Sequence, residues 1–123
     1  MLRAGLGFVG ALALLTGTAF AQAGDPAAGE KVFTQCKACH TVQAGQNRVG
    51  PSLFGVVGRA AGAVEGFAYS PAMKGSGMTW TAETLDKYLT DPKAAIPGNK
   101  MVFPGLKKPE DRANVIAYLA QQK

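Results

Sequence analysis

The chain has 123 residues, 47% of them hydrophobic, and a formal net charge of +5. This length holds one small domain and excludes a multidomain protein. With two cysteines and one histidine, the chain also cannot complete a structural zinc site from thiols and imidazole alone. The basic balance suits a nucleic acid, an anionic lipid surface or an acidic protein as partner.

The first residues have the pattern of an export signal. Met1-Leu2-Arg3 gives a short positive start, and residues 4–15 form an uncharged run of apolar and small residues. Ala19-Phe20-Ala21 then offers a small-x-small cleavage pattern, which Ala21-Gln22-Ala23 repeats two residues on. A retained membrane anchor is the alternative, since the run stays uncharged to Gly24, but no basic stop-transfer cluster follows it.

We therefore expect removal of residues 1–21, with cleavage after Ala23 instead of Ala21 as the second possibility. Residues 22–123 then form a single mature domain. Export predicts a periplasmic location and argues against a nucleic-acid partner.

Asp25-Pro26 predicts the start of the first helix, because aspartate caps helix N-termini and proline suits the first helical position. The helix is expected to run to about Cys36, with Val32, Phe33 and Cys36 along one face. Gly29 lies a turn earlier on that face. Because glycine has no side chain, another helix can approach closely there.

The segment Cys36-Lys37-Ala38-Cys39-His40 contains both cysteines and the only histidine. Cys-x-x-Cys-His is the attachment motif of a c-type haem. The two thiols can add to the two vinyl groups of the porphyrin, and the adjacent imidazole can bind the iron. The sequence therefore predicts one covalent haem c, attached through Cys36 and Cys39, with His40 as an iron ligand.

Three other uses of this motif are weaker but remain open. A thioredoxin-like redox site follows a strand, and no alternating β-branched run precedes Cys36. Zinc would need a carboxylate ligand or a dimer to complete its coordination. A disulfide between cysteines three residues apart would be strained and would stabilise little.

The region from Gln43 to Tyr69 is rich in glycine and poor in periodic apolar residues, which is typical of a loop. A loop of this length is unusual in a compact domain. A prosthetic group around which the loop can wrap accounts for it.

Helices are expected to alternate with loops in the remainder. Ser70-Pro71 predicts a short helix over 71–74, and Thr81 caps a helix over 82–90 that Asp91-Pro92 ends. Leu85, Tyr88 and Leu89 form the apolar stripe of the second of these helices.

A haem iron bound by His40 has a second axial position, and no second histidine is available to fill it. The methionines beyond the leader are Met73, Met78 and Met101, and lysine is a weaker candidate. Met101 lies in a Pro- and Gly-rich segment, 96–105, that can hold a side chain across the ring from His40. On the residues alone, Met101 as an ordinary core methionine remains equally open.

The last helix is predicted to start near Pro109, with Glu110 and Asp111 placed favourably for the helix dipole. Val115, Ile116 and Leu119 face inward, with Tyr118 beside them. The predicted fold is all-α: a single small domain of about four to five helices, with long Gly/Pro loops wrapped around one covalent haem c.

With these motifs in place, residues 24–121 resemble class I cytochrome c, in particular the soluble exported bacterial branch similar to mitochondrial cytochrome c. The resemblance rests on Cys-Lys-Ala-Cys-His-Thr-Val at 36–42, Val-Gly-Pro-Ser-Leu-Phe-Gly at 49–55, Gly-Arg at 58–59, Gly-Phe-Ala-Tyr-Ser at 66–70, Met-Thr-Trp at 78–80, Tyr-Leu-Thr-Asp-Pro at 88–92, Pro-Gly-Asn-Lys-Met-Val-Phe at 97–103 and Ile-Ala-Tyr-Leu at 116–119.

The resemblance implies roles at matching positions. Cys36 and Cys39 carry the thioethers, and His40 and Met101 are the two iron ligands. The Pro51 carbonyl accepts the ring N–H of His40, which fixes its tautomer.

Further matching positions surround the haem. Positions near the haem propionates are matched by Arg59, Tyr69, Trp80 and Asn99. Tyr88 matches the tyrosine near the distal methionine, and Phe103 matches the aromatic residue by the haem edge. Gly29 and Phe33 match the crossing of the first and last helices near Tyr118.

One position departs from the family pattern. Many members have asparagine where this chain has Met73, which puts the usual distal-side water network in doubt. Either the side chain of Met73 fills the space of that water network, or Met73 competes as an iron ligand.

The resemblance implies a one-electron carrier without enzymatic activity, expected to be a monomer. It would shuttle electrons from a quinol–cytochrome c reductase to a terminal oxidase or photosynthetic reaction centre. The alternative is a peroxidase-like or ligand-binding cytochrome with a labile Met101.

Basic side chains are candidates for a rim that docks on acidic surfaces of membrane redox complexes, although single surface lysines usually serve solubility. They are Lys31, Lys37, Arg48, Lys93, Lys100, Lys107 and Lys108.

Overall fold

This computed structural model describes residues 24–123. The predicted leader, with cleavage after Ala21 or Ala23, lies outside the described residues. Within them the helices are α2 (Pro26–Phe33), α3 (Pro71–Lys74), α4 (Ala82–Thr90), α5 (Pro92–Ala95) and α6 (Pro109–Ala120). Extended pairing in this part of the chain is limited to one bridge, Ala60 to Thr79. The all-α prediction is confirmed.

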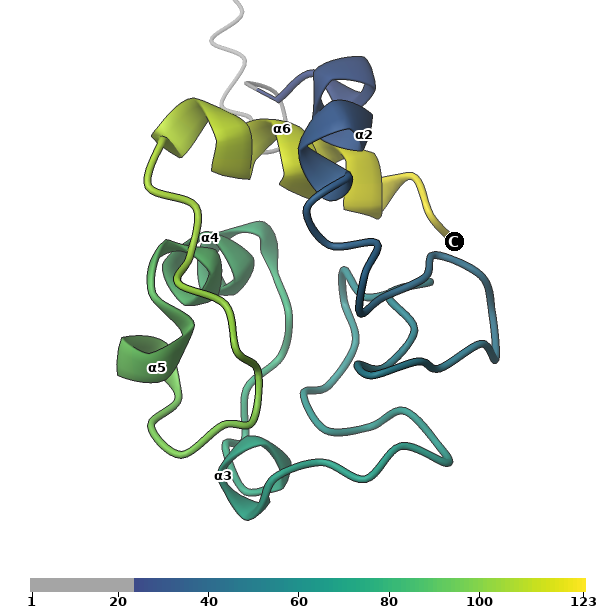
Figure 1. Cartoon of the computed structure of the whole chain (residues 1–123), viewed down its shortest axis with the longest axis vertical. Coiled ribbons are helices and arrows are strands. Elements are labelled where there is room, and N and C mark those ends of the chain that lie inside the picture. Colours follow the sequence, from purple (N-terminus) through teal and green to yellow (C-terminus); the bar gives the residue numbers. More distant parts are fainter. Residues whose placement is uncertain (1–23) are drawn as a thin grey trace, which may run out of the picture.

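Helices α2 and α6 cross at one end of the molecule (Figure 1). The crossing is close because Gly29 has no side chain: a Cβ there would collide with the Asn114 carbonyl oxygen and lie 2.8 Å from Cβ of Tyr118. The rings of Phe33 and Tyr118 pack beside it, with centroids 5.4 Å apart. The predicted contact of the first and last helices is confirmed.

Helix α2 starts as predicted, since Oδ1 of Asp25 accepts a hydrogen bond from the Ala27 amide at 3.0 Å. It ends at Phe33, three residues before the predicted end. Tight turns replace the last helical turn: the Cys36 amide bonds to the Phe33 carbonyl at 2.8 Å, and the Cys39 and His40 amides share the Cys36 carbonyl. The haem motif therefore lies on a coiled turn and not on the helix itself.

Helices α3 and α4 have the predicted bounds. Thr81 and Thr84 form a reciprocal cap at the start of α4. Helix α5 was not predicted separately; Asp91-Pro92 was interpreted only as the end of α4. The same pair also starts α5, because Oδ1 of Asp91 accepts from the Ala94 amide at 3.2 Å.

The core forms where α4 and α6 meet the loops. Most residues that the helical spacing predicted to face inward are buried: Leu85, Tyr88, Val115, Ile116 and Leu119. Leu89, which belongs to the predicted stripe of α4, is only half-buried. Asp86 of α4 and Arg112 of α6 form an ion pair of 2.7 Å.

Figure 1 shows the segment after α2 and the segment leading into α6 on opposite sides of the molecule, below the α2–α6 crossing. The first carries the cysteines and His40, and the second carries Met101. No helix within residues 24–123 is long and apolar enough to cross a membrane.

Candidate functional site

Cys36 and Cys39 are free, half-buried thiols at the end of α2. Burial, with a contribution from the neighbouring Cys39, raises the pKa of Cys36 to about 11. The two free thiols lie on one turn, three residues apart, which is the spacing that the two vinyl groups of a porphyrin require.

The Nδ1 atom of His40 lies 2.7 Å from the carbonyl oxygen of Pro51. Because that oxygen can only accept, Nδ1 carries the proton and Nε2 keeps its lone pair. Burial lowers the pKa of His40, although the Pro51 bond opposes this shift. The net lowering of the pKa favours the neutral ring, and the bond to Pro51 leaves Nε2 as the nitrogen able to bind a metal.

Gly50 is the backbone against which this ring packs. A Cβ at Gly50 would overlap Cε1 of His40 and lie 2.7 Å from its Nδ1. The loop is fixed in place because the Gly50 amide donates to the Cys39 carbonyl at 2.8 Å. Gly50 was not among the residues predicted from the sequence, although its place directly before Pro51 was a usable indication.

The sulfur of Met101 accepts a hydrogen bond from the hydroxyl of Tyr88, with the two heavy atoms 3.9 Å apart. Tyr88 is buried on α4, and burial raises its pKa to about 12. Its hydroxyl therefore stays protonated and remains a donor at neutral pH. Met101 itself is half-buried.

Asn99 holds the backbone of the same loop. Its Oδ1 accepts from the Met101 amide at 2.9 Å, and its Nδ2 donates to the carbonyls of Pro92 and Ile96, each at 2.8 Å. Both side-chain N–H groups are thus directed at backbone oxygens. The match of Asn99 to a position near the haem propionates stays a prediction.

Arg59, Tyr69 and Trp80 form one cluster. The Trp80 amide donates to the Arg59 carbonyl at 2.8 Å, and the indole packs on Tyr88 with ring centroids 4.9 Å apart. Burial lowers the pKa of Arg59, while Tyr69 acts in the opposite sense.

The guanidinium of Arg59 has an unused buried donor. Its Nη1 donates to the Phe54 carbonyl at 3.0 Å, but among residues 24–123 nothing accepts from its buried Nε. A buried cationic donor without an acceptor suits an anionic group such as a carboxylate. This is the feature of the structure that best fits a haem propionate.

Phe103 is half-buried two residues after Met101, and its neighbour Val102 is 92% exposed. The sequence did not predict that an apolar side chain next to Met101 would be this exposed.

The seven basic side chains of the predicted rim are all exposed. The ammonium of Lys107 donates to two backbone carbonyls, those of Thr90 and Pro104, at 3.0 and 2.9 Å, and Arg48 donates to the Lys37 carbonyl at 3.4 Å. Lys107 therefore also satisfies the C-terminal end of α4.

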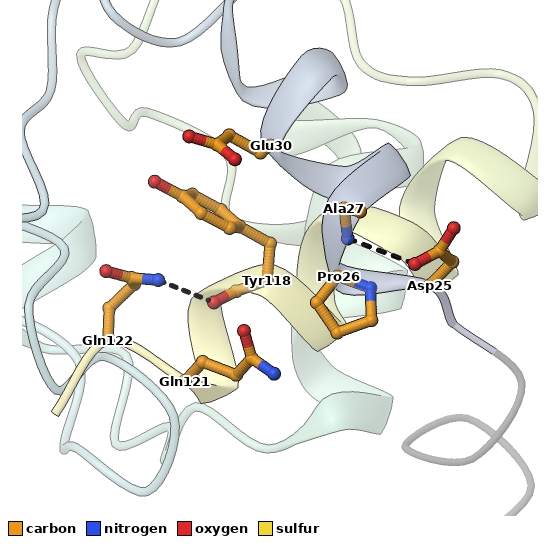
Figure 2. A pocket seen from close by; sticks show the side chains of 7 residues that line it. All are labelled: Asp25, Pro26, Ala27, Glu30, Tyr118, Gln121 and Gln122. Carbon is orange, nitrogen blue, oxygen red and sulfur yellow. Dashed lines mark hydrogen bonds between the residues drawn. The ribbon is translucent and has the colours of Figure 1, made fainter.

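A pocket of about 610 Å³ lies where the start of α2 meets the end of α6 (Figure 2). Asp25, Glu30 and Tyr118 line it, together with Pro26, Ala27, Gln121 and Gln122. None of the predicted haem residues belongs to it. Among residues 24–123 there is also no group of three His, Cys, Asp or Glu side chains able to hold a metal ion.

The family model for cytochrome c matches residues 26–123. Cytochrome c2 of Rhodomicrobium vannielii is 56% identical over 118 residues, covering 95% of this chain and 94% of that protein. Cytochrome c of Ginkgo biloba is 52% identical over 100 residues, 80% of this chain and 88% of that protein. The solved structure of cytochrome cH from Methylobacterium extorquens superposes with a TM-score of 0.75 at 52% identity, covering 79% of this chain and 98% of that one.

Proposed function

The chain belongs to the cytochrome c family, and from that premise we propose that His40 and Met101 would be the two protein ligands of its haem iron. The protein carries one haem c through Cys36 and Cys39 and is an electron carrier, not an enzyme. When bound, the haem supplies a centre that accepts and releases one electron.

His40 supplies the nitrogen ligand in this proposal. The Pro51 carbonyl holds the ring N–H at Nδ1, which aims Nε2 at the metal and increases its basicity. The lowered pKa of His40 keeps the ring neutral, as metal binding requires.

The observation that carries the proposal is the hydrogen bond from Tyr88 to Met101. A buried hydroxyl that donates to the thioether restricts the orientation of the Met101 sulfur. A filled sixth position suits electron transfer rather than ligand binding, since little has to move when the charge changes. Thioether ligation also favours ferrous iron and raises the reduction potential.

The other predicted residues surround the haem. Arg59 donates from its unpaired Nε to a propionate, with Tyr69 and Trp80 beside it. Phe103 lies at the haem edge, and Met73 fills the space on the Met101 side with an apolar side chain. Asn99 acts on the loop through its backbone contacts.

Docking uses the exposed basic side chains around Met101 and the cysteine pair, which suit acidic surfaces of membrane redox complexes. A quinol–cytochrome c reductase is the proposed donor, and a terminal oxidase or photosynthetic reaction centre the proposed acceptor. The leader pattern of residues 1–21 supports a periplasmic mature domain spanning 22–123.

Carbon monoxide binding tests the Met101 assignment, because the gas binds ferrous haem only at an open position. The parent protein is expected not to react at neutral pH, and Met101→Ala is expected to bind the gas fully. Met73→Leu and Met78→Leu are matched controls that should behave as the parent. Strong binding by the parent would favour the labile, peroxidase-like alternative, and gas binding by Met73→Leu alone would move the ligand to Met73.

A further inference from the structure

The segment between α5 and Met101 is held by polar contacts and not by packing. Pro97, Gly98 and Lys100 are all exposed. A stretch of exposed residues has few apolar contacts to fix its position, so its hydrogen bonds decide how easily it moves.

Asn99 supplies those hydrogen bonds. The side-chain oxygen Oδ1 accepts from the Met101 N–H at 2.9 Å, and the side-chain nitrogen Nδ2 donates to the carbonyls of Pro92 and Ile96 at 2.8 Å each. This side chain therefore connects the peptide of Met101 to both ends of α5.

The two anchor points on α5 are rigid. Pro92 is among the largest fully buried side chains of the described residues, and Ile96 is 4% exposed. Asp91 caps the same short helix. The Met101 peptide is thus tied to a fixed part of the core through one asparagine.

We propose that Asn99 is a positioning residue that sets how firmly Met101 occupies its place on the iron. The inference rests on the proposed ligation by Met101. Displacing Met101 from the metal moves its peptide away from Asn99 and breaks the clamp. The clamp therefore stabilises the bound state of the thioether over any displaced state.

Competition by imidazole on the ferric holoprotein measures this effect. One net hydrogen bond corresponds to roughly twofold to tenfold in an equilibrium constant. Asn99→Ala removes the whole clamp, so imidazole is expected to bind about tenfold more tightly, with a weaker sulfur-to-iron charge-transfer band.

A partial rescue separates the two halves of the clamp. In Asn99→Ser a hydroxyl can still accept from the N–H two residues on, as in a serine turn, but it cannot reach α5. Imidazole affinity is expected to fall between those of the parent and Asn99→Ala. This variant also keeps the test valid should the alanine protein fold poorly.

Asn114→Ala is the matched control, because Oδ1 of Asn114 likewise accepts a backbone hydrogen bond, from Asp25 at 2.8 Å, at the α2–α6 crossing. It should lower stability without changing imidazole affinity. Equal affinities for the parent, Asn99→Ala and Asn114→Ala would overturn the clamp. If Met101→Ala fails to increase imidazole affinity, the ligation itself is wrong, which is a separate outcome.

Discussion

The imidazole of His40 lies between two features of one short loop, the Pro51 carbonyl that it donates to and the bare backbone of Gly50. The motif with Cys36 and Cys39 indicated from sequence that His40 binds a metal. The family resemblance predicted the Pro51 contact, which the structure contains, but not the packing of the ring against Gly50, because that depends on how the loop folds back. The residue that carries the chemistry was predictable, and the space it needs was not.

Gly50→Ala tests this need for space. The new Cβ would collide with the ring of His40 and push Nδ1 away from Pro51. We expect a loss of stability of about 2 kcal/mol from overpacking, and a lower yield of holoprotein, measured by the Soret absorbance per chain. Gly45→Ala is the control, because a Cβ there meets nothing within 4 Å and costs only about 1 kcal/mol of left-handed backbone strain. Equal yields for the two variants would contradict the steric role of Gly50.

Helices illustrate which parts of the fold follow from local sequence. The starts of α2, α3 and α4 were predicted because Asp25, Ser70 and Thr81 cap them through contacts with residues two or three positions away. The early end of α2 was not predicted, since it depends on how the Cys36–His40 turn closes. Helix α5 was missed although Asp91-Pro92 repeats the pattern of Asp25-Pro26, because the pair was interpreted only as the end of α4 and not also as the start of a new helix.

Gly29→Ala is the sharpest test of the α2–α6 crossing. A methyl group there would collide with the Asn114 carbonyl of α6, so the helices must separate. We expect a loss of about 2–3 kcal/mol in the free energy of unfolding, despite the better helix propensity of alanine. Denaturant titration measures it. Glu30→Ala is the control, because Glu30 is the next residue of α2 and is exposed. Its free energy of unfolding should stay within about 0.5 kcal/mol of the parent value. A Gly29→Ala protein as stable as the parent would contradict the close crossing.

The ion pair of Asp86 and Arg112 joins α4 to α6 and is largely buried, with side-chain exposures of 20% and 11%. Arg112 also donates to the Leu106 carbonyl at 2.8 Å, beyond the Met101 loop. Asp86→Ala leaves a buried guanidinium without its carboxylate, which is expected to cost about 3 kcal/mol in denaturant titrations. Asp86→Ala with Arg112→Met should recover part of that loss, because no unpaired charge remains buried. A double variant less stable than Asp86→Ala would contradict this account.

At the scale of the whole molecule, the excess of basic residues bears on docking. The basic rim residues are all exposed, while Asp25 and Glu30 line the pocket at the α2–α6 crossing, to which no lysine or arginine contributes. The sequence shows the excess of basic residues but not its placement, because that depends on how the loops fold around the haem.

This distribution predicts that electron transfer to an acidic membrane partner slows as salt is added, since the screening length falls from about 30 Å at 0.01 M to about 10 Å at 0.1 M. Lys93→Gln and Lys100→Gln, which flank the Asn99 clamp, should each lower the rate at low salt and flatten its salt dependence. Lys123→Gln, at the C-terminal end of the chain, is the matched control and should follow the parent. Stopped-flow reduction and oxidation over a range of salt concentrations measures both effects. A parent rate independent of ionic strength would remove the steering role of the rim, and equal slopes for Lys100→Gln and Lys123→Gln would place the docking charges elsewhere.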